Sequence, residues 1–313
     1  MIWIELLLLA FGFLLLVKGA DWFVEGSSGV ADKFGIPQLV IGLTIVAMGT
    51  SAPEAAVSIT AALKGNAEIT VGNIVGSNIL NIFIILGIAS AITSIAVAKT
   101  TIRYEIPIML AATFLLLGFG YTGGTLNLLE GILLLVCFIG YLGYMFVMCR
   151  KGQMQAEEMK ATNSPVWKLL VQGVVGLVLV VWGSDVTVDA ATGIANMYEI
   201  DERFIGLTIV ALGTSLPELF TSVVAARKGK ADIAIGNIVG SNIFNILFVI
   251  GTSSLIIPVI FKPNFIIDCI VAILAGIVLW LCVFRKQKLT RTGGIFMLAC
   301  YAIYFLYLFF FSL

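Results

Sequence analysis

The sequence contains no histidine, and charged residues are scarce. Without histidine, imidazole proton relays and imidazole metal ligands are excluded. Charged residues make up 12% of the 313 positions and hydrophobic residues 60%, whereas soluble domains contain about 25% charged residues. The five cysteines form no CxxC pair, which argues against zinc binding and thiol redox chemistry. This composition, with a mean hydropathy of +1.10, predicts an integral membrane protein.

Long apolar runs follow one another along the whole chain. A bilayer core about 30 Å thick requires roughly 20 apolar residues per helix, and the runs lack the alternation of β-strands. We therefore expect an all-α membrane protein whose ten transmembrane helices lie in the lipid bilayer. The expected spans are 2–25, 37–63, 69–95, 104–121, 126–149, 166–189, 203–227, 232–258, 264–284 and 293–313.

The distribution of lysine and arginine predicts the orientation of these spans, because cytoplasmic loops collect basic residues. If the N-terminus lies outside, fourteen Lys and Arg residues fall on one side of the membrane and three on the other. We therefore expect both termini outside the cell membrane and a cytoplasmic linker at 150–165. The 18 basic and 18 acidic residues balance, so charge gives no indication of a nucleic-acid partner, and no protein partner is implied.

The two halves of the chain repeat each other. Residues 42–90 and 206–254 are identical at 30 of 49 positions, at a constant offset of 164 and without a gap. A unit of five spans ends on the opposite side of the membrane from its start, so the second copy must be inverted. The sequence therefore predicts two inverted five-helix repeats, 1–149 and 166–313, with a substrate site near the bilayer midplane where they meet.

Glu54 and Glu218 lie deep within apolar spans, in the repeated motifs GTSAPE and GTSLPE. An ionisable group at that depth is costly and is functional by default. Because the repeat relates the two glutamates, we expect their carboxylates to converge. Two nearby carboxylates repel each other unless a cation or a proton lies between them, so the pair predicts a cation site.

Proline follows a small polar cluster in both motifs. Pro53 and Pro217 cannot donate a hydrogen bond to the carbonyl four residues earlier, so each helix should break and leave carbonyls at 47–50 and 211–214 free. Side chains three or four residues before each glutamate share its helical face. These oxygen-bearing residues are Thr50, Ser51, Thr214 and Ser215.

A second repeated motif, GNIVGSN, contributes further oxygens. Its serine and the asparagine four residues later lie on one helical face; these residues are Ser77, Asn81, Ser241 and Asn245. Because every candidate ligand is an oxygen, the site should select a hard cation such as calcium or sodium over zinc or copper. Two roles are open to the remaining asparagines of these motifs, as ligands or as interhelical hydrogen-bond partners, and we expect the second. These residues are Asn73, Asn78, Asn237 and Asn242.

The remaining acidic residues of interest fall near the ends of spans. We expect interfacial hydration to suffice for them. They are Asp21, Glu105, Glu130, Asp185, Asp189 and Asp268.

The two motif pairs resemble those of the calcium/cation antiporter superfamily, whose inverted repeats have the form G-T-S-x-P-E and G-N-x-x-G-S-N-x-x-N/D. The resemblance covers the whole chain and implies a sodium/calcium exchanger-like fold of the prokaryotic type. It implies four cation sites between the second, third, seventh and eighth helices, with calcium and sodium alternating at the centre. The implied ligands are Glu54, Glu218, Thr50, Ser51, Thr214, Ser215, Ser77, Ser241, Asn81 and Asn245, with the carbonyls of Ala47 and Ala211.

The chain departs from the family pattern in two places. Many sodium/calcium and potassium-dependent members have aspartate where this chain has Asn245, so the site here has two formal charges instead of three. The segment 150–165 is also too short for the calcium-sensing insertion of animal exchangers.

These observations predict a secondary antiporter that exchanges Ca2+ for Na+ by alternating access and needs no cofactor, with the first and sixth helices sliding to expose the site. A proton/calcium exchanger, or one for another divalent cation, is the near alternative. A cation channel is a different class, since oxygen-lined broken helices also build selectivity filters. An enzyme is not expected, because no nucleophile or water-activating metal set accompanies the two carboxylates.

Overall fold

The computed structural model describes residues 2–65, 68–155, 164–198, 211–308 and 310. Helices dominate it, and several contain π-helical segments, labelled η. In the first half the elements are α1 (Ile2–Phe34), α2 (Gln38–Ile41), η1 (Gly42–Val46), α3 (Ala47–Thr50), α4 (Ala52–Leu63), α5 (Glu68–Leu80), η2 (Asn81–Leu86), α6 (Gly87–Ile92), β1 (Ile95–Ala96), η3 (Thr101–Glu105), α7 (Ile106–Gly123), β2 (Thr125–Leu126) and α8 (Leu128–Gln155). In the second half they are α9 (Val166–Met197), α11 (Ala211–Thr214), α12 (Leu216–Arg227), α13 (Ala231–Phe244), η5 (Asn245–Ile250), α14 (Gly251–Ile256), β3 (Val259–Ile260), α15 (Asn264–Phe284), β4 (Lys288–Leu289) and α16 (Arg291–Tyr307).

The described helices confirm an all-helical membrane protein. Seven are long and apolar enough to cross a bilayer, and the bent pair Gln38–Thr50 and Ala52–Leu63 makes an eighth if it is one span. Of the two other expected spans, 203–227 begins outside the described residues. The last is represented by α16, whose 17 residues extend about 26 Å at 1.5 Å per residue. The count of ten spans therefore stays a prediction.

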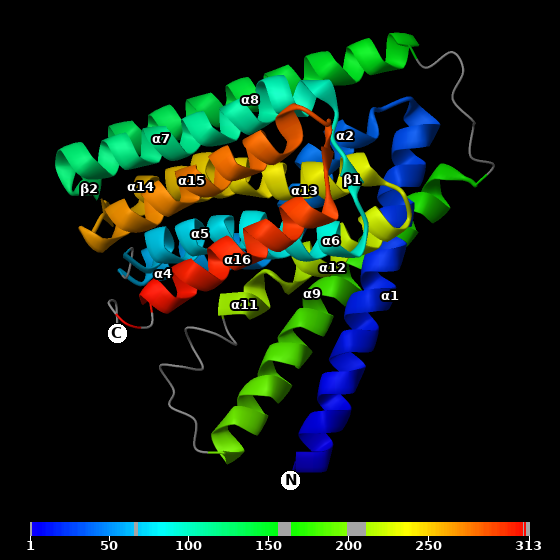
Figure 1. Ribbon diagram of the computed structural model, residues 1–313, viewed down its shortest axis with the longest axis horizontal. Coiled ribbons are helices and arrows are strands. Elements are labelled where there is room, and N and C mark those ends of the chain that lie inside the picture. Colours follow the sequence, from blue (N-terminus) through cyan, green and yellow to red (C-terminus); the bar gives the residue numbers. More distant parts are fainter. Residues whose placement is uncertain (1, 66–67, 156–163, 199–210, 309, 311–313) are drawn as a thin grey trace.

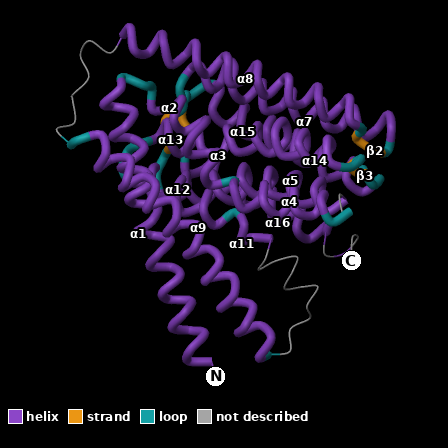
Figure 2. The backbone as a smooth tube through the Cα atoms, turned by 180° about the vertical axis from the view of Figure 1, so that it is seen from behind, coloured by secondary structure: helices purple, strands orange, loops and turns teal. Residues whose placement is uncertain are grey.

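The helices α1 and α9 form a long pair that projects from the rest of the bundle. They lie side by side along their length and run antiparallel, with the N-terminus of the chain at the projecting end (Figures 1 and 2). Both helices expose many large apolar side chains, as expected for surfaces in contact with lipid. The pair is thus a distinct layer beside the bundle that contains the two motifs.

Glycines allow the backbones of α1 and α9 to touch. A Cβ atom on Gly19 would lie 2.7 Å from the backbone nitrogen of Val180, and one on Gly176 would lie 2.3 Å from that of Phe23. Gly12 and Gly183 oppose each other in the same way, seven residues from Gly19 and Gly176 and nearer to the projecting end of the pair. Small residues at such positions are typical of closely packed membrane helices, whose association depends on van der Waals contact.

The repeated GNIVGSN motifs lie on the most buried helices. The helix from α13 through α14 is almost entirely enclosed, and that from α5 through α6 is largely so, whereas most residues of α1, α7, α8 and α9 are not fully buried. The buried pair therefore forms the centre of the molecule, with the other helices arranged around it (Figure 1). The motif asparagines at 81 and 245 begin the π-helical segments η2 and η5, at matching places in the two halves. Such segments are rare and often lie at functional sites.

Two short β-ribbons join connections from different halves of the sequence. β1 pairs antiparallel with β4, and β2 pairs antiparallel with β3. Each strand has two residues, so the ribbons do not alter the helical class. The helix α8 continues as far as Gln155, so the first residues of the expected linker at 150–165 are helical; residues 156–163 lie outside the described part of the chain.

The close approach at Gly19 predicts the cost of a larger residue there. Gly19→Leu should lower the stability by about 1–3 kcal/mol, because the new side chain meets the backbone of α9 and must push the helices apart. Gly143→Leu on α8 is the matched control, since a Cβ atom there has no neighbour within 4 Å. Thermal unfolding of the two purified variants measures the difference; equal midpoints would contradict this account of the α1–α9 contact.

Candidate functional site

Each motif helix breaks at a serine. Ser51 separates α3 from α4 with φ −81° and ψ 7°, and Ser215 separates α11 from α12 with φ −92° and ψ 2°. The axes on the two sides of Ser51 differ by 50°. Pro53 and Pro217 occupy the second position of the helix that follows, where a missing N–H group removes no intrahelical hydrogen bond. The predicted breaks are confirmed.

The carbonyl of Ala47 is not left unpaired by the first break, contrary to the prediction from sequence. It accepts a hydrogen bond from the backbone N–H of Ser51 at 3.0 Å and one from the hydroxyl of Ser241 at 3.3 Å. The backbone turns tightly enough at Ser51 to keep this bond, so the chain bends without opening. At the second break the carbonyl of Gly213 accepts a hydrogen bond from Ser184 on α9 at 2.6 Å.

The two glutamates converge through crossed hydrogen bonds. Ser51 Oγ donates to Glu218 Oε1 at 2.8 Å, and Ser215 Oγ donates to Glu54 Oε1 at 3.2 Å. Both glutamate side chains have no exposed surface. Each carboxylate is therefore held by the break in the other half of the chain.

Four oxygens at this junction are buried and have no hydrogen-bond partner within the described structure. They are Glu54 Oε2, Glu218 Oε2, Asn81 Oδ1 and Asn245 Oδ1. Nearly all buried polar atoms in proteins are paired, and an unpaired one carries a large desolvation cost. The set consists of the same two atoms from each repeat.

Asparagines from the two GNIVGSN motifs bind each other reciprocally. Asn78 Nδ2 donates to the carbonyl of Asn242 at 3.2 Å, and Asn242 Nδ2 donates to that of Asn78 at 3.1 Å. Asn81 Nδ2 donates to Asn242 Oδ1 at 3.0 Å, and Asn245 Nδ2 donates to Asn78 Oδ1 at 3.1 Å. The predicted interhelical role of Asn78 and Asn242 is confirmed. These bonds use the amide nitrogens of Asn81 and Asn245 and leave their oxygens as acceptors.

A further pair of asparagines supports the helix that carries each glutamate. Asn73 Nδ2 donates to Ser58 Oγ at 2.9 Å and to the carbonyl of Glu54 at 3.3 Å. Asn237 Nδ2 donates to Ser222 Oγ at 2.9 Å in the same arrangement. The sequence analysis missed Ser58 and Ser222, although both copies have serine four residues after the glutamate.

The remaining predicted ligands belong to the same motif helices, and their hydrogen-bond partners differ. Thr50 is fully buried and donates to Asn237 Oδ1, with the two oxygens 3.0 Å apart. Ser77 is buried on α5, one turn before Asn81. Thr214 ends α11, and Ala211 begins it at the edge of the described residues. Their service as ligands stays a prediction.

A cavity of about 650 Å³ leads from this junction towards one end of the bundle. Ser215, whose hydroxyl binds Glu54, lines it together with Leu212, and Asp268 lies on its wall with Tyr304 as hydrogen-bond partner at 2.8 Å. Glu105, directly before α7, is fully buried and accepts a hydrogen bond from Tyr144. The expectation that Glu105 is hydrated is therefore wrong, because α8 covers it.

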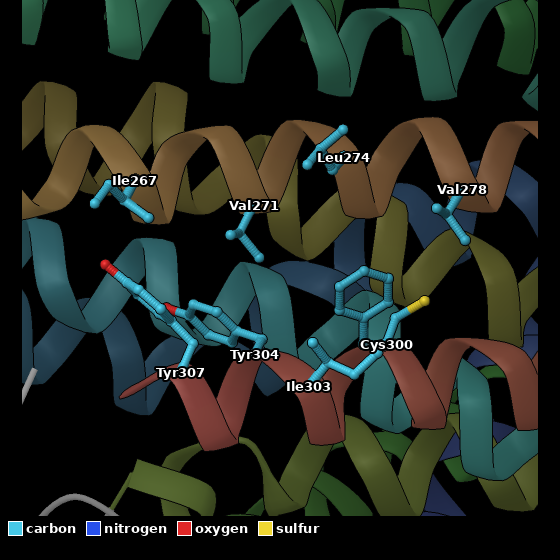
Figure 3. Close-up of a pocket in the computed structure, with 9 residues that line it drawn as sticks. Ile267, Val271, Leu274, Val278, Cys300, Ile303, Tyr304 and Tyr307 are labelled. Carbon is cyan, nitrogen blue, oxygen red and sulfur yellow. The ribbon is translucent and has the colours of Figure 1, made fainter. Parts of the chain in front are cut away.

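The groove between α15 and α16 has a different character. Its volume is about 460 Å³ and its lining is almost entirely apolar, with Val271 and Leu274 of α15 facing Ile303 and Tyr304 of α16 (Figure 3). It offers no set of oxygens for a cation. Among the described residues no three His, Cys, Asp or Glu side chains are grouped to share a metal ion, so any cation at the junction meets two carboxylates and neutral oxygens.

Comparison with known proteins agrees with this geometry. The profile of the family described as sodium/calcium exchanger protein matches residues 4–147 and, again, 168–310. The chain belongs to the sodium/calcium exchanger family. Putative antiporter CaxA of Alkalimonas amylolytica is 43% identical over 256 residues, 79% of each chain. Sodium/calcium exchanger MaX1 of Methanosarcina acetivorans is 32% identical over an alignment that covers 99% of this chain and 100% of the relative.

A solved structure extends the likeness to three dimensions. The sodium–calcium exchanger NCX_Mj superposes with a TM-score of 0.85 at 32% identity, over 98% of this chain and 100% of that one. Family and fold are thus those of cation antiporters of the membrane, and not those of an enzyme family. The resemblance stated from the motifs is confirmed.

The asparagine network predicts the effect of a third carboxylate. Asn245→Asp removes the donor to Asn78 and places an anion among buried oxygens, so the ion-free exchanger should unfold at a lower temperature. Added Ca2+ should raise the unfolding midpoint of the variant more than that of the wild type, because the extra charge strengthens cation binding to the folded state.

Thermal unfolding with and without CaCl2 measures both effects. Asn127→Asp, in the exposed turn before α8, is the control for the substitution itself. An ion-free midpoint equal to that of the wild type would contradict the arrangement described for Asn245.

Proposed function

We propose that this exchanger binds Ca2+ and Na+ in alternation at the junction of its two halves and carries one against the other across the cell membrane. The observation that carries the proposal is the set of four buried, unpaired oxygens from Glu54, Glu218, Asn81 and Asn245. Two carboxylates give the site a formal charge of −2 when ionised. One Ca2+ or two Na+ ions would balance that charge, so the two kinds of ion compete for the same oxygens.

The chemistry of the lining supports a hard cation. Ca2+ takes about 6–8 oxygen ligands, including carboxylates and carbonyls. The crossed serine bonds hold Oε1 of each glutamate and leave Oε2 for the ion. The proposed ligands are Glu54, Glu218, Thr50, Ser51, Thr214, Ser215, Ser77, Ser241, Asn81 and Asn245, with the carbonyls of Ala47 and Ala211.

We further propose ten membrane helices in two inverted repeats, 1–149 and 166–313, joined by a cytoplasmic linker at 150–165, with both termini outside. The reciprocal contacts support a twofold relation between the repeats, since a contact from residue i to residue j is matched by its counterpart at the 164-residue offset. The glycine contacts of α1 and α9 follow the same rule. Sliding of this pair against the core would then open the site to either side.

The cavity beside Ser215 supports access from the outer face in this conformation. Under the proposed orientation, Asp268 and Tyr304 lie towards the outer ends of α15 and α16. A carboxylate on the wall of a cavity raises the local concentration of cations and so speeds their entry. Asp268 is therefore proposed as an entry residue, and not as a ligand.

Proton-driven Ca2+ exchange is the second candidate. The same observation supports it, because protonation of the Oε2 atoms would remove the uncompensated buried charges of Glu54 and Glu218. A pH gradient without Na+ would then drive Ca2+ uptake. A channel would conduct without any counter-ion, so flux that needs no gradient of Na+ or H+ would favour that class.

Flux in proteoliposomes tests the site. An outward Na+ gradient should drive 45Ca2+ uptake, and Glu54→Gln or Glu218→Gln should reduce it by roughly 100-fold or more, since each removes one of two charges from a buried site. Glu130→Gln is the control, because Glu130 is only half-buried and accepts a hydrogen bond from the backbone N–H of Asn127 before α8. Uptake that persists in both site variants would refute the assignment.

The entry residue has a different kinetic signature. Asp268→Asn should raise the KM for external Ca2+ by about 3-fold to 10-fold at low ionic strength and leave the maximal rate unchanged, because it weakens attraction and not binding. The effect should shrink at high salt, where screening removes it for the wild type as well. A fall in maximal rate with unchanged KM would contradict the proposed role.

A further inference from the structure

An ion-pair cluster ties the projecting pair to the bundle at one end. Lys228 Nζ lies 2.5 Å from Asp21 Oδ1 and 2.7 Å from Glu25 Oε1. Gln172 on α9 donates to the other oxygen of Glu25 at 2.9 Å. Asp21 and Glu25 are four residues apart on one face of α1, whereas Lys228 directly follows α12. We call Asp21, Glu25 and Lys228 the inner cluster.

All three charges recur in the other half at the repeat offset. Asp185 and Asp189 on α9 correspond to Asp21 and Glu25, and Lys64 corresponds to Lys228. Lys64 directly follows α4 and has φ −86° and ψ 2°, almost the values of Lys228. We call Asp185, Asp189 and Lys64 the outer cluster. The sign of every charge is kept, although Glu25 has become Asp189.

The two clusters are in opposite states. The inner cluster is formed, and α1 packs along α12 beside it. In the described structure the outer cluster forms no ion pair, its three side chains are exposed, and α9 is not packed along α4 as α1 is along α12. Figure 2 shows the C-terminal end of α9 projecting away from the bundle, and Asp185 and Asp189 belong to the C-terminal half of this helix. The two halves thus place equivalent charges in different surroundings.

We propose that the inner and outer clusters are alternate latches, of which the inner one closes when the site faces outward and the outer one closes when it faces inward. When α1 and α9 slide as a unit, Lys228 loses Asp21 and Glu25 while Lys64 meets Asp185 and Asp189. This inference rests on the proposed alternating access and on the proposed orientation. It assigns the sidedness of the exchanger to six charged residues outside the ion site.

The expected energies suit a device that biases an equilibrium. Exposed ion pairs contribute little to folding, because water screens them and side-chain ordering opposes them. Two conformations of an antiporter must be close in free energy, so a small difference changes their populations several-fold. When one latch opens and its equivalent closes, the total ion-pair energy stays nearly constant. Neither conformation is then so stable that the exchanger cannot leave it.

Cysteine labelling measures which side is open without reference to the transported ion. In a background with the five native cysteines replaced by alanine, Leu212→Cys places a thiol on the wall of the outer cavity, at a residue that is 44% exposed. A membrane-impermeant maleimide added outside proteoliposomes should label it. Lys228→Gln should slow this labelling about 5-fold, because it opens the inner latch and favours the inward-facing state.

Three comparisons make the result specific. Lys64→Gln should not slow the labelling, and adding it to Lys228→Gln should restore the rate towards that of the wild type. Lys230→Gln, two residues from the latch and without an ion pair in the described structure, should have no effect. Glu25→Gln provides a milder opening of the inner latch in case Lys228→Gln fails to fold. Wild-type labelling in both inner-latch variants, or slower labelling in Lys64→Gln, would overturn the proposal.

The labelling result and the flux result are independent. If Lys228→Gln slows labelling but a Na+ gradient drives no Ca2+ uptake, the latch proposal is supported and the proposed identity of the transported ions is wrong. If uptake is normal in the wild type and labelling is unchanged by the inner-latch variants, the latch fails alone.

Discussion

Two carboxylates enclosed at the centre of an apolar bundle are the constraint on which the rest of the structure depends. An ionised group in that environment costs several kcal/mol unless it is paired. Ser51 and Ser215 satisfy one oxygen of each carboxylate, and no other described group satisfies the second. Under the proposed function a bound cation coordinates these second oxygens, so that ion binding contributes to stability as well as to transport.

Neither half of the chain can form this site alone. Ser51 from the first half holds Glu218 from the second, and the asparagine pairs cross between halves in the same way. A site built from crossed contacts stays intact only if the two motif regions move together. α1 and α9 pack against each other through glycine-rich surfaces, and under the proposed alternating access they move as one unit against these regions.

Duplication in the sequence identified the glutamates and serines, because two copies of one motif distinguish functional polar residues from incidental ones. It could not place the π-helical segments at Asn81 and Asn245, since the choice between α and π geometry depends on packing around the helix. Whether the carbonyl of Ala47 keeps its hydrogen bond likewise depends on how tightly the backbone turns at Ser51, which the sequence does not specify. Glu105 was misjudged because its position near a span end says nothing about the helix that covers it.

Differences between the two halves are informative because the repeats share one sequence pattern and equivalent residues can be compared directly. Lys228 is paired, whereas Lys64, its counterpart at the 164-residue offset, is exposed and forms no ion pair in the described structure. Equivalent residues in equivalent repeats would have equivalent surroundings if the molecule were symmetric. Local sequence does not account for the unequal pairing of Lys64 and Lys228, because both follow matching helices with the same backbone geometry. Under the latch proposal this asymmetry belongs to the conformation, and an inward-facing state would then exchange the roles of the two halves.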